Sequence, residues 1–507
     1  MRNNNTPVTR YFLGFAIDKL LVIGSIITIA IATLYPFNFS IPQNFSVGEI
    51  FASFDNTSFF NDQVNNVLLF MPLGFGLASI FQRIKVKALL QIPLVIIAGA
   101  SLSFSVEFLQ AFLPSRSPTP ADILNNAIGA FVGLGCFYIC DSHSFLKIIG
   151  SIENSYFSNS SKKTIILLVG YILLTFGIGM SWQNNISLSE WNANFPLILG
   201  NETTGNRPWQ GYISQISFAD EVVSDIQIQR ILANQNYLFK NQDLLIANYD
   251  FNGKNNYRDK TGKLPDLLWQ GELPKLENSD TVKGVILTSN SWLKSADSAK
   301  FVNQKISKKS RFTVITTVAS ANSNQTGPAR IISLSGDSLH RNLTIGQEKQ
   351  NLQLRLRTPI TGQNGSDINI NVPNVFSDTD SHQIVITYSK AIVNVYVDRY
   401  DNVYRFNLLD LLPNNQKVFS YAITFLPLGL CLALLSIISK RKFHLNRLIL
   451  IIGILLPSLI VESILIHLND KNLSLINLAF GIFFTACTAL FLQVRTALLS
   501  KNELING

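Results

Sequence analysis

Eight long apolar stretches dominate the hydrophobic pattern of the chain, and polar residues separate each stretch from the next. A helix needs about 20 apolar residues to cross a bilayer, and most of the stretches reach that length. We therefore expect about eight transmembrane helices. The stretches are Leu20–Tyr35, Val64–Gln82, Ala88–Leu113, Asp122–Cys140, Thr164–Trp182, Val418–Ser439, Leu448–Leu468 and Leu473–Val494.

The first stretch has an alternative interpretation as a cleaved signal peptide. Such a peptide ends at a cleavage site formed by small residues. No convincing site of this kind precedes Pro36, so we expect a retained helix.

Between the fifth and sixth apolar stretches the pattern changes to short alternating runs in a sequence rich in Asn, Ser, Thr and Gly. Many short strands separated by turn residues are typical of an antiparallel sandwich. We therefore predict an all-β jelly-roll sandwich over residues 183–412, inserted into a polytopic α-helical membrane protein. The runs are GYISQISFA, LLIANYDF, GVILTSN, FTVITTVAS, ARIISLSG, LQLRLRT, HQIVITYS and AIVNVYVD.

Positive charge gives the expected orientation of the helices. If the N-terminus is cytoplasmic, fifteen Lys and Arg residues near the helix ends fall inside, and only Arg116, Lys417 and Lys471 fall outside. Cytoplasmic loops carry an excess of Lys and Arg. We therefore expect both termini in the cytoplasm and the sandwich in an extracytoplasmic position.

Composition agrees with a membrane protein that carries a polar insert. The 507 residues include only 14% charged residues and carry a net charge of +9, and the mean hydropathy is +0.24. Most of the positive surplus falls on the predicted cytoplasmic side. No basic stripe interleaved with aromatic residues is present, so nothing favours a nucleic-acid partner.

Cysteine and histidine usage gives no sign of a metal or cofactor. The four cysteines all fall in predicted helices, and the five histidines are scattered without zinc-ligand spacing. Asp398 and Asp401 follow a predicted strand and are the nearest approach to a calcium site. Two acids in a turn are more simply explained as solvated side chains. We expect no metal and no cofactor.

Polar side chains interrupt the apolar pattern at the ends of three predicted helices. Gln110 lies one helical turn beyond Glu107 on the same face. A charged group near the centre of a bilayer costs roughly 3 kcal/mol, so Glu107 should face the helical bundle or a wet cavity in the outer leaflet. The candidate ligand-binding residues are Asn66, Glu107, Gln110, Arg116, Asp122, Asn125 and Asn126. The alternative is that Glu107, Arg116 and Asp122 form a hydrogen-bonded staple without a ligand.

The chain also contains an internal similarity. NVLLFMPLGFGLASIFQRIKVK resembles YAITFLPLGLCLALLSIISKRK, and the same offset pairs Glu107 with Glu462. A three-residue deletion then pairs Asn125 with Asn477. We interpret the last three helices as a degenerate second copy, in which Glu462 and Asn477 are the retained counterparts.

The second copy lacks part of the polar set. Leu465 stands where the first copy has Gln110, and Ser474 stands where it has Asp122. The first copy therefore carries the more complete candidate site. The domains that we predict are 1–59 (a helix and loop), 60–141 (the first helical unit), 142–182 (a cytoplasmic loop and the fifth helix), 183–412 (the sandwich) and 413–507 (the second unit).

Two stretches of the first unit carry a family resemblance. NVLLFMPLGFGL and VEFLQAFLPSRSPTPADILNNAIGAFVG resemble the VanZ-like family, whose pattern has Asn before Phe-x-Pro-x-Gly, then Glu-x-x-Gln, Arg, Asp and Asn-x-x-x-Gly. The resemblance implies an integral protein of the bacterial inner membrane with a role in the cell envelope. The namesake of the family is associated with low-level teicoplanin resistance, and no accepted reaction goes with the family.

The polar insert carries a second resemblance. WQGYISQISFADEVVSDIQIQRI, ANYDFNG and HQIVITYSKAIVNVYVDRY resemble the laminin-G and concanavalin-A-like sandwiches, which commonly bind glycans. The stretch with Trp209 and Gly211 comes first here, whereas its counterpart usually closes such a domain. This order suggests a permuted or reorganised sandwich.

These observations leave three functions open. The favoured one is a non-enzymatic envelope protein that binds membrane lipids and a lipid-linked glycan, glycolipid or envelope polysaccharide. The first alternative is a membrane enzyme in which Glu107 and Asp122 act as acid and base on a lipid-linked sugar or phosphoester. The second alternative is a transporter. The binding interpretation is favoured because the sequence shows no nucleophile elbow, clustered histidine, metal set or phosphate-binding glycine loop. The oligomeric state stays open.

Overall fold

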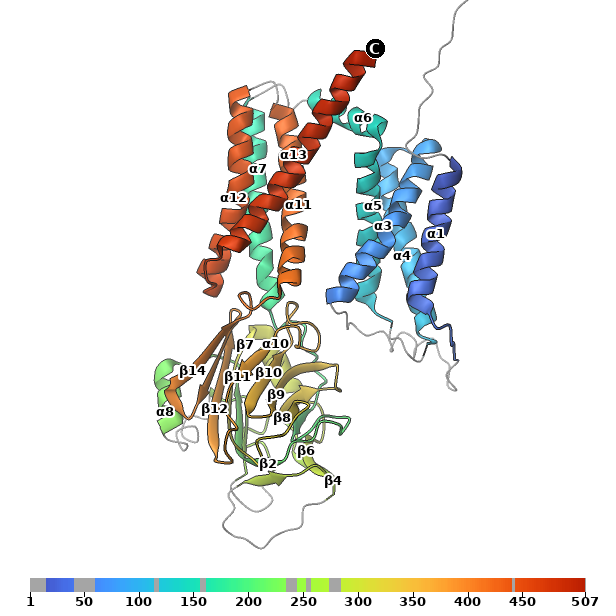
Figure 1. Cartoon of the computed structure of the whole chain (residues 1–507). Coiled ribbons are helices and arrows are strands. Elements are labelled where there is room, and N and C mark those ends of the chain that lie inside the picture. Colours follow the sequence, from blue (N-terminus) through green and yellow to red (C-terminus); the bar gives the residue numbers. More distant parts are fainter. Residues whose placement is uncertain are drawn as a thin grey trace, which may run out of the picture. The chain divides into compact units, whose positions relative to one another are not determined.

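The computed structural model of the chain describes residues 15–40, 60–113, 118–155, 161–233, 244–251, 257–272, 284–439 and 443–506. The chain divides into two compact units. One unit holds residues 1–171, 426–454 and 485–507, and the other holds residues 172–425 and 455–484. Figure 1 shows the helices and strands that build them.

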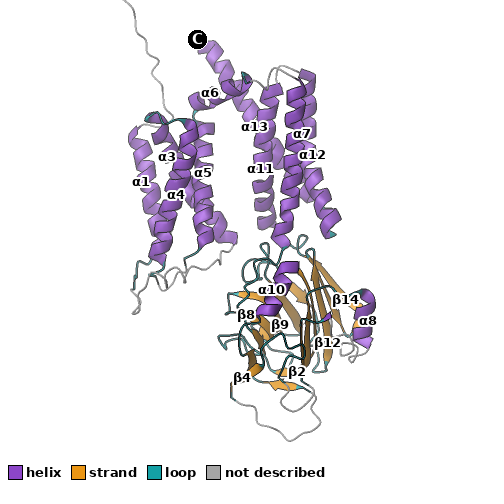
Figure 2. Cartoon of the chain, turned by 180° about the vertical axis from the view of Figure 1, so that it is seen from behind, coloured by secondary structure: helices purple, strands orange, loops and turns teal. Residues whose placement is uncertain are grey.

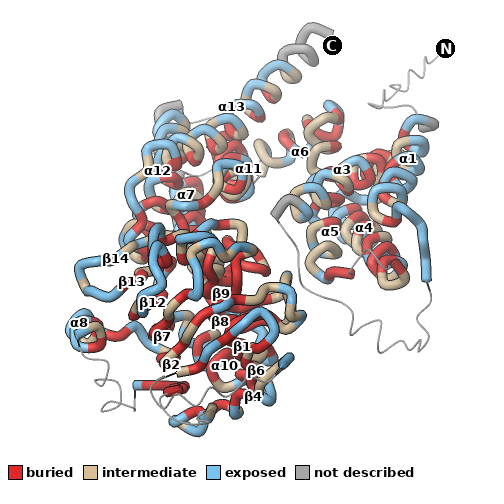
Figure 3. Tube along the Cα trace, turned by 60° about the horizontal axis from the view of Figure 1, so that its bottom comes forward, coloured by how far each residue is buried: buried red, intermediate tan, exposed pale blue. Residues whose placement is uncertain are grey.

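Eight helices among the described residues are long and apolar enough to cross a membrane. This number confirms the expectation from the hydrophobic pattern. Many large apolar side chains on these helices are exposed, such as Leu89 at 82% and Leu475 at 76%, as expected for surfaces that face lipid (Figure 3). The helices are α1 (Phe15–Leu34), α3 (Phe60–Arg83), α4 (Ala88–Gln110), α5 (Pro120–Cys140), α7 (Ser161–Ser181), α11 (Asn414–Ser439), α12 (Phe443–Asn469) and α13 (Leu475–Asn506).

Glycines bring the backbones of α3 and α5 into direct contact. A Cβ atom at Gly74 would lie 1.9 Å from the carbonyl oxygen of Ala130, and one at Gly133 would lie 2.0 Å from that of Met71. Only glycine permits this separation. Small residues allow such close packing where lipid supplies no hydrophobic drive between helices. The polar residues at the ends of α3 and α5 are held in place by this contact.

A short amphipathic helix, α6 (Ser142–Glu153), lies where the sequence predicts a cytoplasmic loop. Asp141 caps it, because its Oδ2 atom accepts the N–H of Ser144 at 2.9 Å. Phe145 and Ile149 pack in a buried cluster with residues of α11 and α13. Helix α6 therefore ties the first helices of the chain to the last ones within one unit.

The polar insert forms two antiparallel sheets of seven strands, drawn in orange in Figure 2. The first sheet has the order β11-β10-β9-β8-β1-β6-β4. The second has the order β14-β13-β12-β7-β2-β3, with β5 pairing to β2. The strands are β1 (Leu197–Leu199), β2 (Gly211–Ala219), β3 (Ala247–Asp250), β4 (Leu267–Gly271), β5 (Val285–Leu287), β6 (Ser291–Ser295), β7 (Arg311–Ser320), β8 (Ala329–Ser335), β9 (Arg341–Glu348), β10 (Asn351–Leu356), β11 (Ile370–Val372), β12 (His382–Ser389), β13 (Ile392–Val397) and β14 (Arg399–Asn407). The predicted β-sandwich is therefore present, and each of the eight predicted runs contains a strand.

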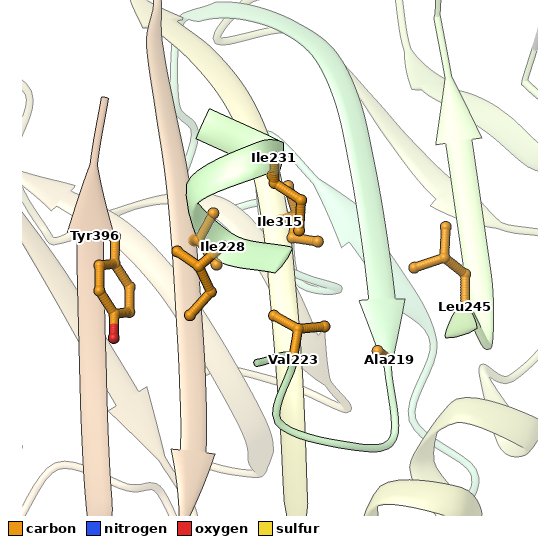
Figure 4. Packing of buried hydrophobic residues seen from close by; sticks show 8 residues of the cluster. Ala219, Val223, Ile228, Ile231, Leu245, Ile315 and Tyr396 are labelled. Atoms are coloured by element: carbon orange, nitrogen blue, oxygen red, sulfur yellow. The ribbon is translucent and has the colours of Figure 1, made fainter. Parts of the chain in front are cut away.

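Two helices supplement the sheets: α8 (Asp225–Ala233) and α10 (Lys300–Lys309). Figure 4 shows Ile228 and Ile231 of α8 directed at the second sheet, where Ile315 and Tyr396 belong to the same buried cluster. Helix α8 therefore covers one face of this sheet and leaves the other face to the sandwich core.

Hydrogen bonds fasten the sandwich to the helix ends of its own unit. The side chains of Gln183 and Asn469 bond to each other at 2.7 and 2.9 Å. Asn407, at the end of β14, donates to the carbonyl oxygen of Asn469 at 2.9 Å. Asp410 accepts from the side chain of Asn472 at 2.8 Å. These contacts fix the α12–α13 connection against the sandwich.

Candidate functional site

Glu107 links the end of α4 to the beginning of α5. Its side chain belongs to a residue only 2% exposed, and its Oε2 atom accepts the backbone N–H of Thr119 at 2.7 Å. Thr119 directly precedes α5, so the carboxylate satisfies an N–H group at the positive end of a helix. Asp122, in the first turn of α5, lies within electrostatic range of Glu107. The structure therefore brings these two predicted acids together.

A second contact joins α4 and α5 one turn deeper. Asn126 is 2% exposed, and its Nδ2 atom donates to the Ser103 hydroxyl at 2.8 Å. The Oδ1 atom of Asn126 is also buried and has no hydrogen-bond partner among the described residues. A buried acceptor without a donor costs free energy. This oxygen is therefore suited to accept a hydrogen bond from a bound group.

The remaining candidates are less concentrated than the sequence suggests. Gln110 turns toward α1, where its Nε2 atom donates to the carbonyl oxygen of Thr33 at 3.1 Å. Asn66 and Asn125 are half-buried on α3 and α5. Arg116 lies outside the described residues. Glu107, Asp122 and Asn126 thus form the described part of the candidate site.

Comparison with known families gives one match in this part of the chain. Residues 19–141 match the VanZ/LLP1 family model. They are a VanZ-like region. The match includes most of α1 and all of α3, α4 and α5. The region therefore contains all seven candidate ligand-binding residues predicted around Glu107. Comparison with curated proteins and with solved structures finds no match.

The VanZ-like region also contains an apolar groove between α1 and α3. Its volume is about 430 Å³. Small residues on α1 open it, because nothing lies within 4 Å of the position that a Cβ atom would take at Gly24. The groove is lined by Leu20, Leu21, Gly24, Ser25, Thr28, Leu68, Leu69 and Pro72.

A second buried acid, Glu462 on α12, lies outside the VanZ-like match and has closer partners than Glu107. Its Oε2 atom lies 2.6 Å from the Nζ atom of Lys471, and the Tyr421 hydroxyl donates to its Oε1 atom. The Trp182 ring packs edge-on against Tyr421. Sequence reasoning identified Glu462 but not these two partners. The sequence signal for this ion pair was Lys471 alone, nine residues after Glu462.

Helix boundaries relate the two acids without any gap. Helix α12 begins at Phe443, 355 residues after Ala88, and α13 begins at Leu475, 355 residues after Pro120. Glu462 follows Glu107 by the same interval. A register of 355 residues is thus an alternative to the three-residue deletion of the sequence alignment, and it would pair Asn477 with Asp122 rather than with Asn125.

Close contacts recur in this register. Gly74 meets the backbone of Ala130, and the residues 355 positions later, Gly429 and Thr485, meet in the same way. The Ser103 side chain contacts Asn126. A Cβ atom at Gly481, which corresponds to Asn126, would lie 2.5 Å from Ser458 Oγ. The register also pairs Tyr421 with Asn66 and Lys471 with Arg116.

Asn477 is a partial addition to the polar cluster formed by Glu462, Lys471 and Tyr421. It is 2% exposed, and its backbone N–H donates to the Ser474 hydroxyl at 3.3 Å at the start of α13. Its Oδ1 atom is buried without a hydrogen-bond partner among the described residues. Asn477 thus lies near the helix start, as its predicted counterpart does in the VanZ-like region.

The two acids of the sandwich turn, Asp398 and Asp401, have protein partners. Asp398 accepts the N–H of Gln383 at 2.7 Å and lies 2.7 Å from the His382 ring. This contact with Asp398 raises the pKa of His382. Asp401 pairs with Arg399, which lowers the pKa of the Asp401 carboxyl. Among the described residues, no three His, Cys, Asp or Glu side chains gather as metal ligands.

Proposed function

We propose that the protein is a cell-envelope membrane protein whose VanZ-like region binds the sugar-bearing headgroup of a lipid-linked glycan, glycolipid or glycopeptide at the outer leaflet. The observation that carries the proposal is the pair of buried acceptors on adjacent helices, the Glu107 carboxylate and the partnerless Asn126 Oδ1. Sugar hydroxyls are donors that match both acceptors. Arg116, placed in the connecting loop by the sequence, would supply a cation for a phosphate or carboxylate.

The polar residues around Glu462 support the proposed site around Glu107. We infer that α11, α12 and α13 are a degenerate copy of α3, α4 and α5, related by the 355-residue register. Tyr421 and Lys471 then stand for Asn66 and Arg116, and both contact the acid that stands for Glu107.

The groove between α1 and α3 supports a lipid-linked ligand. Its lining is mainly apolar and belongs to two membrane-spanning helices. An acyl or prenyl chain would lie in this groove while the headgroup reaches Glu107. Burial of apolar chain surface would then contribute most of the affinity, at about 25 cal/mol per Å², and the polar cluster would contribute specificity.

The proposed orientation of the protein in the membrane follows from the distribution of positive charges along the sequence. We propose that both termini are cytoplasmic and that the sandwich, a laminin-G or concanavalin-A-like domain, holds a glycan outside the membrane. Reporter fusions that are active only in the periplasm test this topology. Activity is expected after Trp182 and not after Lys442, and the reverse pattern would invert the model.

An acid–base enzyme is the second candidate. The observation that favours it is the electrostatic proximity of Glu107 and Asp122, because two acids in different environments can divide the roles of acid and base. Purified Glu107→Gln and Asp122→Asn proteins decide between the candidates. Turnover of a lipid-linked glycan by the wild type that is lost in both variants, with binding retained, would establish catalysis.

The binding proposal is tested with a polyprenyl-diphosphate-linked disaccharide as probe and with native mass spectrometry of the full chain in detergent. Glu107→Gln keeps an oxygen that can accept the Thr119 N–H, so the fold should persist while the sugar contact weakens. Asn126→Ala removes the partnerless acceptor.

The matched control for Asn126→Ala is Asn477→Ala, because Asn477 also has a buried Oδ1 atom without a partner. We expect weaker probe binding in Glu107→Gln, on the order of tenfold because a hydrogen bond to a charged group is weakened, and a smaller loss in Asn126→Ala, because the amide oxygen is neutral. Asn477→Ala should bind like the wild type. Equal binding by all four proteins would contradict the proposal.

A further inference from the structure

One face of the first sheet carries three arginines on adjacent strands. Arg341 of β9 lies opposite Ser335 of β8, and Arg355 of β10 lies opposite Thr344 of β9. Residues directly opposite in a sheet share a face. A register shift between Leu334 and Ser335 places Arg341 opposite Ser335, so that Arg341 shares the face of Thr344 although it lies two residues from Leu343 of the other face. Arg330 of β8, opposite Gly346, belongs to the same face by this register. The opposite face, with Leu343, Ile345 and Leu354, is fully buried.

Two of these arginines are buried, and the described residues around them include few acids to neutralise them. Arg330 is 1% exposed and Arg341 is 2% exposed. Glu202 pairs with Arg330 at 3.3 Å. The Nε and Nη1 atoms of Arg341, and the Nη1 atom of Arg330, are buried with no hydrogen-bond partner among the described residues. Buried charged donors without acceptors are costly.

Electrostatics give the same picture. Burial, reinforced by the nearby positive charges of Arg330 and Arg355, lowers the pKa of Arg341 to about 9. Burial lowers the pKa of Arg330 to about 10, even though Glu202 acts in the opposite direction. Among the described residues, the acids that act on the cluster of four arginines, which includes Arg207, are Glu202 and Glu348.

The segment that precedes β2 borders this face. Thr203 donates its hydroxyl to the carbonyl oxygen of Ser335 at 3.1 Å. Arg207 donates to the carbonyl oxygen of Gly327 at 2.5 Å. Arg207 and Arg355 are half-exposed, whereas Arg330 and Arg341 are buried. A ligand could therefore approach along the half-exposed pair and reach the buried pair.

We propose that this arginine face, formed by Arg207, Arg330, Arg341 and Arg355, binds an oxyanion carried by an acidic polysaccharide. The planar guanidinium fork matches a carboxylate or phosphate with two parallel hydrogen bonds. The bound oxyanion would supply the acceptors that Arg341 lacks. This inference deepens the proposed glycan-binding role of the sandwich and rests on it for the polysaccharide. It does not depend on the site in the VanZ-like region.

The test measures thermal unfolding of the full chain in detergent with increasing inorganic phosphate, at constant ionic strength set by chloride. A uronate trisaccharide and a neutral trisaccharide are titrated in parallel. The variants are Arg341→Met, which replaces the buried cation by an apolar side chain, and Arg258→Met. Arg258 has a side chain that is 82% exposed and pairs with Asp266, so it serves as the control.

We expect phosphate and the uronate trisaccharide to raise the unfolding temperature of the wild type and Arg258→Met in a saturable way. In Arg341→Met the affinity should fall about tenfold or more. Without ligand, Arg341→Met should unfold at the same or a higher temperature, because an uncompensated buried charge is removed. Should Arg341→Met fail to fold, Arg355→Met is titrated instead and should show the same loss.

The two probes distinguish the sources of the oxyanion. Tighter binding of the uronate than of phosphate supports a polysaccharide, whereas binding of phosphate alone overturns the polysaccharide part of the proposal. An equal phosphate effect in the wild type and in Arg341→Met overturns the site itself. These results do not depend on Glu107→Gln, so failure of the membrane site and failure of this site are separable.

Discussion

Glu107 on α4 and Glu462 on α12 are two buried acids of membrane-spanning helices, but they have different partners. Glu462 receives a cation from Lys471 and a hydroxyl from Tyr421. The described partner of the Glu107 carboxylate is one backbone N–H, that of Thr119. Among the described residues, the acid on α12 is therefore neutralised by a cation, whereas the acid on α4 accepts a backbone N–H, and Asn126 on α5 has a buried acceptor without a described partner.

Under the proposed function, this difference would separate a structural role of Glu462 from a binding role of Glu107. An internal ion pair occupies the space and the hydrogen-bonding capacity that a ligand would use. An acid held by a backbone N–H keeps acceptor capacity for a bound group.

The largest expected effect is at the ion pair of the second unit. Lys471→Met leaves the Glu462 carboxylate buried and uncompensated, so we expect a loss of about 3–5 kcal/mol in the free energy of unfolding. Lys471→Met combined with Glu462→Leu should recover most of this loss. The measurement is denaturant-induced unfolding of the full chain in detergent.

Glu107→Gln is the reference for that experiment. It should cost less than Lys471→Met, since the Gln side-chain oxygen can still accept the N–H of Thr119. If Lys471→Met unfolds like the wild type, or if Glu107→Gln is the more destabilising change, the proposed contrast between Glu107 and Glu462 is contradicted.

A medium effect is expected at the close glycine contacts of α3 with α5 and of α11 with α13. Gly74→Ala forces α3 away from Ala130 and should cost about 1–3 kcal/mol through overpacking. Gly429→Ala should cost less, because the added Cβ atom would lie 2.7 Å from the nearest atom rather than 1.9 Å. Gly24→Ala, where no atom lies within 4 Å, is the control.

Unfolding temperatures of the three variants check this order. A destabilised Gly24→Ala would indicate that loss of glycine flexibility, rather than contact, governs the effect. A neutral Gly74→Ala would contradict the close approach of α3 and α5 on which the geometry of the VanZ-like site depends.

Much of the fold is contained in the hydrophobic pattern. The membrane helices follow from long apolar stretches, and strands such as β2 and β12 coincide with the alternating runs quoted from the sequence. Strand β9 (Arg341–Glu348) was missed because both of its faces are buried, so polar residues such as Arg341 and Gln347 hide the alternation. Helix α6 was missed because its twelve residues carry only a short amphipathic stripe.

The candidate site was less predictable than the fold. Helical spacing identified Glu107 and Asp122 as neighbours, because both lie at helix ends at one depth. It could not show that Gln110 turns toward Thr33, since the packing of α1 on α4 is a tertiary feature. The pairing of Lys471 with Glu462 depends on the path of the α12–α13 connection, which sequence distance does not specify.

The smallest effect that sharpens the comparison is the hydrogen bond between Ser103 and Asn126. The second unit has Gly481 at the position of Asn126, and its Ser458 hydroxyl donates instead to the carbonyl oxygen of Leu478 at 2.9 Å. A double-mutant cycle with Ser103→Ala and Asn126→Ala should give a coupling of about 0.6 kcal/mol, the average for such bonds in membranes. Ser458→Ala should cost less than Ser103→Ala, because the Leu478 carbonyl keeps its place in the helical hydrogen-bonding pattern. A coupling near zero would mean that Ser103 does not orient the Asn126 amide. The Asn126 Oδ1 atom would then have no fixed direction as an acceptor. The proposed difference between the VanZ-like region and helices α11–α13 would then depend on Glu107 alone.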